Sequence, residues 1–256
     1  MSFLSLLYNE IIYRPLLNGL VGIYLLLPYH DLGLAIIMLT LIVRLVLHPA
    51  ISQTIRSQRA MTRIQPRLRE IQQRFKSDKE AQAKETMALY RAEGVNPLSG
   101  CLPLLIQLPV LIGLYRLFWK GLSLTDRSLL YSFLPPFEIF NPVAFGLLNL
   151  TQASIPLAIA AGVSQFLQGY FTPQPQLATP AAGGADFSAM LQWQTRYVFP
   201  VIIAAISWSL PSALAFYWTI FNLLAILQQR FIEWRMSYER GQRTHQSDPA
   251  KDGRAG

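Results

Sequence analysis

The sequence predicts an all-α, polytopic membrane protein with five transmembrane helices, an N-terminal interfacial helix and a cytoplasmic helical hairpin. Of the 256 residues, 52 % are hydrophobic and only 14 % are charged, whereas a soluble domain carries about 25 % charged residues. The apolar residues form long runs, as membrane spans require, and most basic residues lie in two segments outside those runs. Because the chain has one cysteine, Cys101, an intrachain disulfide is excluded.

The N-terminal segment, residues 1–31, is predicted to lie on the membrane surface. Its apolar stretch Pro15–Leu27 is bounded by Pro28 and is too short to span a bilayer, which takes about 20 residues. We therefore interpret it as an interfacial helix. The first transmembrane helix is predicted over Leu32–Leu47, within the region 32–50, and is expected to continue past Pro49 into the cytoplasm.

Residues 51–97 are predicted to form an antiparallel helical hairpin in the cytoplasm. Five apolar residues recur at alternating spacings of three and four, which is typical of a helix that packs against another helix: Met61, Ile64, Leu68, Ile71 and Phe75. Pro66 is expected to kink this helix. A capping box of Ser77 and Glu80 should start the second helix. Its apolar face should continue through Ala83, Met87 and Tyr90, and Gly94 should end it.

Four arginines lie on one stripe of the hairpin: Arg56, Arg59, Arg63 and Arg67. Such a stripe is either a solvated face or a contact surface for anionic lipid headgroups, ribosomal RNA or an acidic partner.

The region 98–235 is predicted to hold the other four spans, at about 101–119, 155–171, 193–210 and 213–232. An extracytoplasmic loop, 120–154, and a cytoplasmic loop, 172–192, connect them, and the polar tail 236–256 is expected to be disordered. Ten basic and five acidic residues lie between 50 and 97, and six basic and four acidic ones follow from Arg230. Positive-inside counting therefore places the N-terminus outside and the C-terminus inside, as five spans require.

Arg44 is the strongest candidate for a functional residue. It lies in the otherwise uncharged run Leu32–Leu47, where a charge costs roughly 2.5–3.5 kcal/mol on insertion scales. At 1.5 Å per residue it lies about 18 Å into a hydrocarbon core ~30 Å thick. A charge at that depth usually faces a protein interior or a wet cavity. The alternative is that its long side chain snorkels to the headgroups.

Polar residues in other spans are candidates for the walls of such a cavity: Gln107 in the second span, Ser164, Gln165 and Gln168 in the third, and Trp218, Asn222 and Gln229 on one face of the fifth. Alternatively, each amide forms an interhelical hydrogen bond worth ~0.6–2 kcal/mol that only holds the bundle together. Trp218 has the alternative role of an interfacial anchor. No carboxylate lies within a span. The partner of Arg44 is therefore expected to be water or an acidic group that arrives from outside.

Enzymatic chemistry is not expected. The sequence has no phosphate-binding glycine motif, and its histidines, His30, His48 and His245, form no metal-ligand cluster. No serine has plausible histidine and carboxylate partners at membrane depth. We expect no cofactor and no metal.

Three segments, in order, closely resemble the YidC/Oxa/Alb family of membrane-protein insertases. They are Gly94–Tyr115 (GVNPLSGCLPLLIQLPVLIGLY), Leu39–Pro49 (LTLIVRLVLHP) and Phe216–Gln229 (FYWTIFNLLAILQQ). With the order of spans, loops and hairpin, the resemblance extends from about residue 8 to 235. It is closest to the short bacterial form without a large periplasmic domain or a lipoprotein signal.

The resemblance implies a hydrophilic groove open to the cytoplasm and to lipid, with Arg44 as its positive charge and Gln165 and Trp218 in its wall. It implies an insertase and folding chaperone that moves short polar tails of nascent membrane proteins without nucleotide hydrolysis. The implied partners are nascent membrane proteins and the lipid bilayer, with the ribosome and the Sec translocon as further candidates. The implied location is the bacterial cytoplasmic membrane, with the thylakoid membrane as the alternative.

Two other functions compete with this one. Arg44 would bind an anion in a small-solute transporter, although no internal repeat is seen. In a structural assembly factor for membrane complexes, activity would depend on the outer faces of the spans and not on Arg44.

Overall fold

The computed structural model describes residues 3–96, 102–119, 127–135, 137, 139–172, 190 and 192–246. The predicted all-α class is confirmed, because helices make up nearly all of the regular structure. The elements are α1 (Phe3–Tyr8), η1 (Asn9–Tyr13), α2 (Arg14–Leu26), α3 (Leu32–Val46), α4 (His48–Arg74), α5 (Lys79–Ala92), α6 (Leu102–Trp119), η3 (Arg127–Leu129), β1 (Val143–Ala144), β2 (Leu148–Asn149), α7 (Ile155–Phe171), η4 (Gln194–Val198), α9 (Phe199–Ser209) and α10 (Ser212–Gln246).

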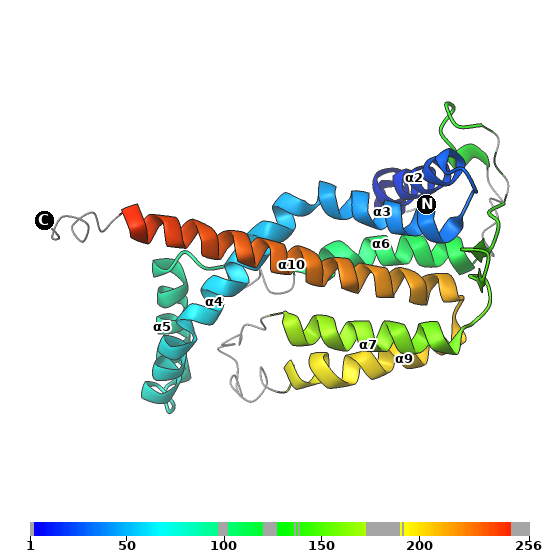
Figure 1. Ribbon diagram of the computed structural model, residues 1–256. Helices are drawn as coiled ribbons and strands as arrows, with labels where there is room; N and C mark the ends of the chain where they lie inside the picture. The colour runs from blue at the N-terminus through cyan, green and yellow to red at the C-terminus, as the bar shows by residue number, and fades with distance from the viewer. Residues whose placement is uncertain are drawn as a thin grey trace, which may run out of the picture.

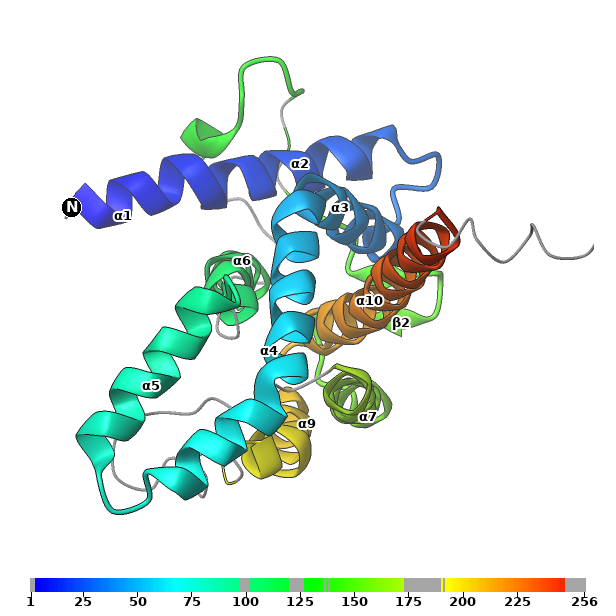
Figure 2. The same cartoon turned by 90° about the vertical axis from the view of Figure 1, so that its left-hand side faces the viewer.

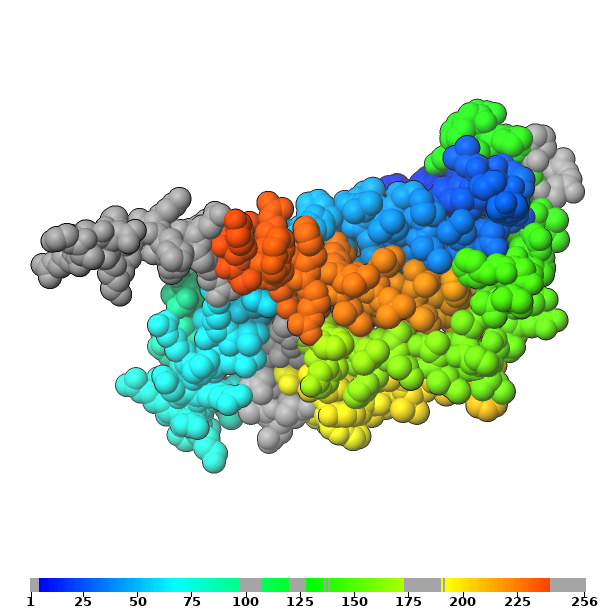
Figure 3. Space-filling view, viewed as in Figure 1, coloured from blue at the N-terminus to red at the C-terminus, as the bar shows by residue number. Residues whose placement is uncertain are grey.

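The helices α3, α6, α7, α9 and α10 lie side by side in one bundle (Figure 1). The α4–α5 hairpin leaves one end of the bundle, and the short antiparallel pair β1–β2 lies at the other end. Seen from that first end, α1 and α2 lie across the bundle (Figure 2). The space-filling view shows α10 along the length of the bundle, between α3 and α7 (Figure 3).

The main hydrophobic core lies between α2, α3, α6 and α10, with the segment 137–150 closing its end. Fully buried side chains from this segment include Phe140 and Leu150. Asp31 caps α3 by accepting a hydrogen bond from the Leu34 amide at 2.8 Å, and it also accepts one from the Phe145 amide. This part of the predicted loop 120–154 is therefore built into the fold and fixes the start of α3.

None of the described helices is, taken singly, long and apolar enough to cross a bilayer. The consecutive helices α3 and α4 meet the length and composition requirement as a pair, with a bend of 66° between them at Leu47. The count of five spans stays a prediction.

The N-terminal helix is longer than predicted. The sequence places its start at Pro15, whereas α1, η1 and α2 form one helical run from Phe3 to Leu26. Proline clashes with the carbonyl four residues before it, and the π-helical turn Asn9–Tyr13 lies where that clash would occur. The second π-helical turn, Gln194–Val198, precedes Pro200 in the same way. In both places a widened turn carries the chain past the proline.

The predicted hairpin is formed by two helices in contact, α4 and α5, but the second helix differs in detail from the prediction. Asp78, not Ser77, caps α5, because its carboxylate accepts a hydrogen bond from the Ala81 amide at 3.0 Å. The expected apolar face is right at Tyr90, which is buried, and wrong at Met87, which is 45 % exposed. The other buried residues of α5 are polar, Gln82 and Thr86.

Polar burial on α5 is tolerated because the Gln82 amide donates to the Gln72 carbonyl at 3.1 Å. The helix α4 continues through Pro66 to Arg74. Of its five predicted seam residues, Met61, Ile64 and Leu68 are buried and Ile71 and Phe75 are half-buried.

The predicted disordered tail is partly wrong, because α10 extends to Gln246. An Arg235–Glu239 ion pair of 3.1 Å at i, i+4 supports this extension, and no proline occurs between Pro211 and Pro249. The residues 247–256, most of the predicted cytoplasmic loop 172–192, and the segments 97–101 and 120–126 lie outside the described residues.

Gly162 lets α7 and α9 approach closely. A Cβ atom at this position would lie 2.8 Å from Ala204 Cβ and 3.1 Å from the Pro200 carbonyl oxygen. We expect Gly162→Ala to lower the free energy of unfolding by about 1–3 kcal/mol, because a helix backbone must move. Gly169→Ala, on the same helix, is the matched control, since its Cβ would lie 3.8 Å from the nearest atom. Thermal unfolding in detergent measures both, and equal stability of the two variants would contradict this account of the packing.

Candidate functional site

Arg44 is buried where α3 meets α10, and it has an unusual set of partners. Only 7 % of the surface of Arg44 is exposed. Nη1 donates a hydrogen bond to Gln228 Oε1 at 2.6 Å, and the guanidinium carbon lies 4.2 Å from the centre of the Phe221 ring. Nε has no hydrogen-bond partner among the described residues. Within that part of the chain no carboxylate forms an ion pair with it, so an amide and an aromatic face stabilise this cation.

A polar chain leads from Arg44 to the start of α4. Gln228 Nε2 lies 3.0 Å from His48 Nδ1, and His48 Nε2 lies 3.2 Å from the Ser52 hydroxyl. On the same side of the bundle, Gln107 of α6 donates to the Tyr217 hydroxyl at 2.6 Å. Tyr217 precedes Phe221 by one turn of α10, so Gln107 belongs with the Arg44 side of the site.

A second polar cluster lies between α7 and α10. Trp218 Nε1 donates to Gln165 Oε1 at 2.8 Å. The amide of Asn222 lies 3.1 Å from the Ser164 hydroxyl and 3.2 Å from Gln165 Oε1. Asn222 is 2 % exposed and Gln165 6 % exposed, so these groups satisfy one another in the interior.

The second cluster continues along α10 to the hairpin. Gln165 donates to Gln168 at 3.4 Å, and Gln168 to the Thr172 hydroxyl at 3.3 Å. Thr172 donates to Gln229 Oε1 at 2.9 Å, and Gln229 Nε2 lies 3.1 Å from Glu233. Glu233 forms an ion pair of 3.0 Å with Arg59 of α4. A run of hydrogen bonds thus joins the interior of the bundle to the hairpin.

The predicted site residues therefore divide into two sets on adjacent faces of α10. Gln165, Gln168, Trp218 and Asn222 come together against α7, whereas Arg44 and Gln107 lie on the side of Phe221 and Tyr217. Sequence reasoning missed Gln228 and gave His48 no role. The available signal was position, because Gln228 follows Phe221 by seven residues and so shares its face.

The four arginines of the hairpin stripe also separate. Arg59 pairs with Glu233, and Arg67 pairs with Glu93 across the hairpin. Arg56 lines a cavity between α4 and α10, and Arg63 is exposed.

The Arg59–Glu233 pair is expected to hold the hairpin against α10. The two side chains are 28 % and 14 % exposed, so losing the charge of Glu233 should cost about 1 kcal/mol. We expect Glu233→Gln to speed amide hydrogen exchange around Arg59 about fivefold. Glu93→Gln breaks the exposed Arg67 pair and serves as control, with a smaller expected change. Unchanged exchange in Glu233→Gln would show that the pair does not hold the hairpin.

The bundle of described helices encloses a guanidinium and a run of amides and hydroxyls, and this polar interior is the candidate site. The family model described as "60Kd inner membrane protein" matches residues 25–239. The chain belongs to this family, the YidC/Oxa/Alb family.

Similar proteins come from Francisella tularensis, in the subspecies novicida, tularensis and holarctica. Each carries the name "Membrane protein insertase YidC", and each is 33 % identical to this chain over 227 residues. The alignment covers 88 % of this chain and 35 % of each relative. The chain thus spans about a third of the length of the curated relatives that it matches.

Proposed function

We propose that the protein is a membrane-protein insertase and folding chaperone that guides short polar tails of nascent membrane proteins through the polar interior of its bundle, without nucleotide hydrolysis. The observation that carries this proposal is the environment of Arg44, a buried cation held by the Gln228 amide and the Phe221 ring. The family and the names of the similar proteins support the same function.

Arg44 has the chemistry to accept an acidic group from outside. Its Nε–H lacks a partner among the described residues, and a buried unsatisfied donor costs about 1–3 kcal/mol. A carboxylate of the tail would bond to Nε and one Nη together, in the bidentate geometry that guanidinium offers. The carboxylate would add the attraction between opposite charges to these hydrogen bonds, so it would compete with the neutral Gln228 amide for the guanidinium. Arg44 would thus be the positive charge of a hydrophilic groove.

The cluster between α7 and α10 would receive the uncharged polar groups of the tail. Each unsatisfied backbone group in hydrocarbon costs several kcal/mol. Gln165, Trp218 and Asn222 exchange hydrogen bonds among themselves at rest, and they would offer donors and acceptors to a passing chain. The apolar segment that follows would then enter lipid with a gain of about 0.8 kcal/mol per buried CH₂, which drives the process.

The proposal places the protein in the bacterial cytoplasmic membrane, with five spans, the N-terminus outside and the C-terminus inside. The hairpin then lies in the cytoplasm, where its arginines and the basic end of α10 meet incoming chains. The ribosome and the Sec translocon are the proposed macromolecular partners at that surface.

Reconstitution tests the proposed function. The purified full chain is placed in liposomes, and protease protection measures the insertion of a single-span substrate with an acidic N-terminal tail, in the absence of nucleotide. We expect insertion well above that of protein-free liposomes. Equal insertion in the two preparations would overturn the proposal.

A further inference from the structure

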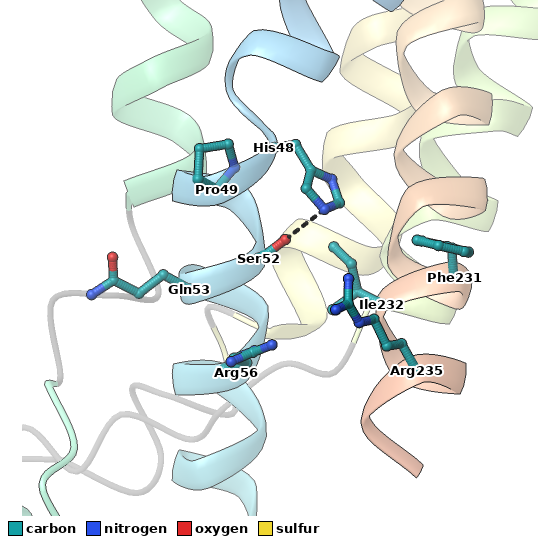
Figure 4. A pocket seen from close by; sticks show the side chains of 8 residues that line it. All are labelled: His48, Pro49, Ser52, Gln53, Arg56, Phe231, Ile232 and Arg235. Carbon is teal, nitrogen blue, oxygen red and sulfur yellow. Dashed lines mark hydrogen bonds between the residues drawn. The ribbon is translucent and has the colours of Figure 1, made fainter. Parts of the chain in front are cut away.

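A cavity of about 340 Å³ lies between the start of α4 and α10, at the end of the polar chain that leads from Arg44 through His48 to Ser52 (Figure 4). Arg56 of α4 and Arg235 of α10 both extend their guanidinium groups toward the space between the two helices. Ser52 and His48 form its wall on the α4 side, and Phe231 and Ile232 belong to α10. Its volume is at the lower end of the range for small-ligand sites.

The cavity carries uncompensated positive charge. Arg235 donates through Nε to Glu239 at 3.1 Å, which leaves the other nitrogens of its guanidinium for another acceptor. Arg56 forms no ion pair with any described carboxylate. Two converging guanidiniums, of which only that of Arg235 pairs with a described carboxylate, favour an anion. The planar fork of arginine matches phosphate oxygens.

Aromatic and apolar side chains beside the cavity indicate a membrane interface. Phe231, Trp234 and Tyr238 form a row on α10, with ring centres 6.2 and 6.0 Å apart. All three are more than half exposed, as are three apolar residues nearer the middle of the bundle: Leu45, Val46 and Leu227. Exposed tryptophan and tyrosine gather at the level of lipid headgroups, and exposed aliphatic side chains suit acyl chains.

We propose that this cavity binds the phosphate headgroup of an anionic phospholipid, with Arg56 and Arg235 on the phosphate and the acyl chains beside Phe231 and Leu227. The lipid would bridge the start of α4 and α10 on the outside of the bundle. This inference rests on the membrane location in the proposed function but not on insertase activity.

Lipid quenching of Trp234 tests the proposal. In full-length protein with the other four tryptophans replaced by phenylalanine, reconstituted in vesicles, brominated phosphatidylglycerol should quench Trp234 more strongly than brominated phosphatidylcholine. Arg56→Gln and Arg235→Gln should each weaken this preference about fivefold, since a basic residue at an anionic surface contributes about 1 kcal/mol. Arg63→Gln, with the same loss of charge outside the cavity, should leave the preference unchanged.

Three results would overturn the lipid site. They are equal quenching by the two lipids, an equal loss in Arg63→Gln, which would indicate a diffuse basic field, and loss of the preference on addition of inorganic phosphate, which would indicate a free-phosphate site. The readout needs no substrate, so failure of the insertion assay leaves it standing, and its own failure leaves the proposed function standing.

Discussion

Insertion of an acidic-tailed substrate is expected to fall at least about tenfold in Arg44→Ala and to be lost in Arg44→Glu. A hydrogen bond to a charged group contributes roughly 1.5–3 kcal/mol, which corresponds to a change of about ten- to 150-fold. In Arg44→Glu the same site repels the tail. Arg44→Lys should keep part of the activity, because an ammonium keeps the charge but not the bidentate geometry. The measurement is the initial rate of protease-protected insertion into liposomes.

Arg116→Ala is the matched control for this series. Arg116 lies in the last turn of α6, donates to Asn9 at 3.1 Å, and has its guanidinium 5.0 Å from the Tyr13 ring. It thus has an amide and an aromatic partner as Arg44 has, but it is exposed and lies against the N-terminal helix. Its removal should leave the rate within about twofold of the wild type. An Arg44→Glu variant that inserts the acidic tail at the wild-type rate would exclude the electrostatic mechanism.

Gln228→Glu is expected to lower insertion of the acidic tail about tenfold or more, although this variant keeps Arg44. The new carboxylate would occupy the Arg44 guanidinium from inside, at the place where Gln228 Oε1 accepts a bond of 2.6 Å. An incoming carboxylate would then have to compete with a carboxylate, and not with a neutral amide, for the guanidinium. The folded protein should be as stable as the wild type or more so, because the buried cation gains a countercharge.

Gln228→Leu separates this effect from simple damage to the site. It removes the acceptor and leaves Arg44 with the Phe221 ring, so it should lower the free energy of unfolding by about 1–3 kcal/mol. Arg44 nevertheless stays available to the tail. Insertion by Gln228→Leu should therefore exceed that by Gln228→Glu, although the latter is the more stable protein. The same rate in Gln228→Glu and the wild type would show that Gln228 does not compete with the substrate.

The parts of the fold that depend on local signals were predicted closely. The span Leu32–Leu47 corresponds to α3, Leu32–Val46, and the span 155–171 coincides with α7. The length of an apolar run and its flanking polar residues decide these limits. The seam of the hairpin was found because Met61, Ile64 and Leu68 recur at helical spacing, and these three residues are buried.

The parts that depend on tertiary contacts were not predicted. A proline usually marks a break in a helix. Nothing in the sequence indicates the widened turn η1, through which the N-terminal helix continues past Pro15. Gln228 and Gln229 are adjacent and identical in type, but one bonds to Arg44 and the other to Glu233. Which of them meets the arginine depends on how α10 is rotated against α3, and only the packed bundle fixes that rotation.

The most direct test of the central claim exchanges the charges on both sides. Wild type and Arg44→Glu are compared in liposomes without a membrane potential, so that the field acting on charged tails is removed. Each is given one substrate with an acidic tail and one in which lysines replace the acidic residues. We predict that the wild type favours the acidic tail and that Arg44→Glu favours the basic one. The same preference in both proteins would contradict the claim that the charge at position 44 receives the tail.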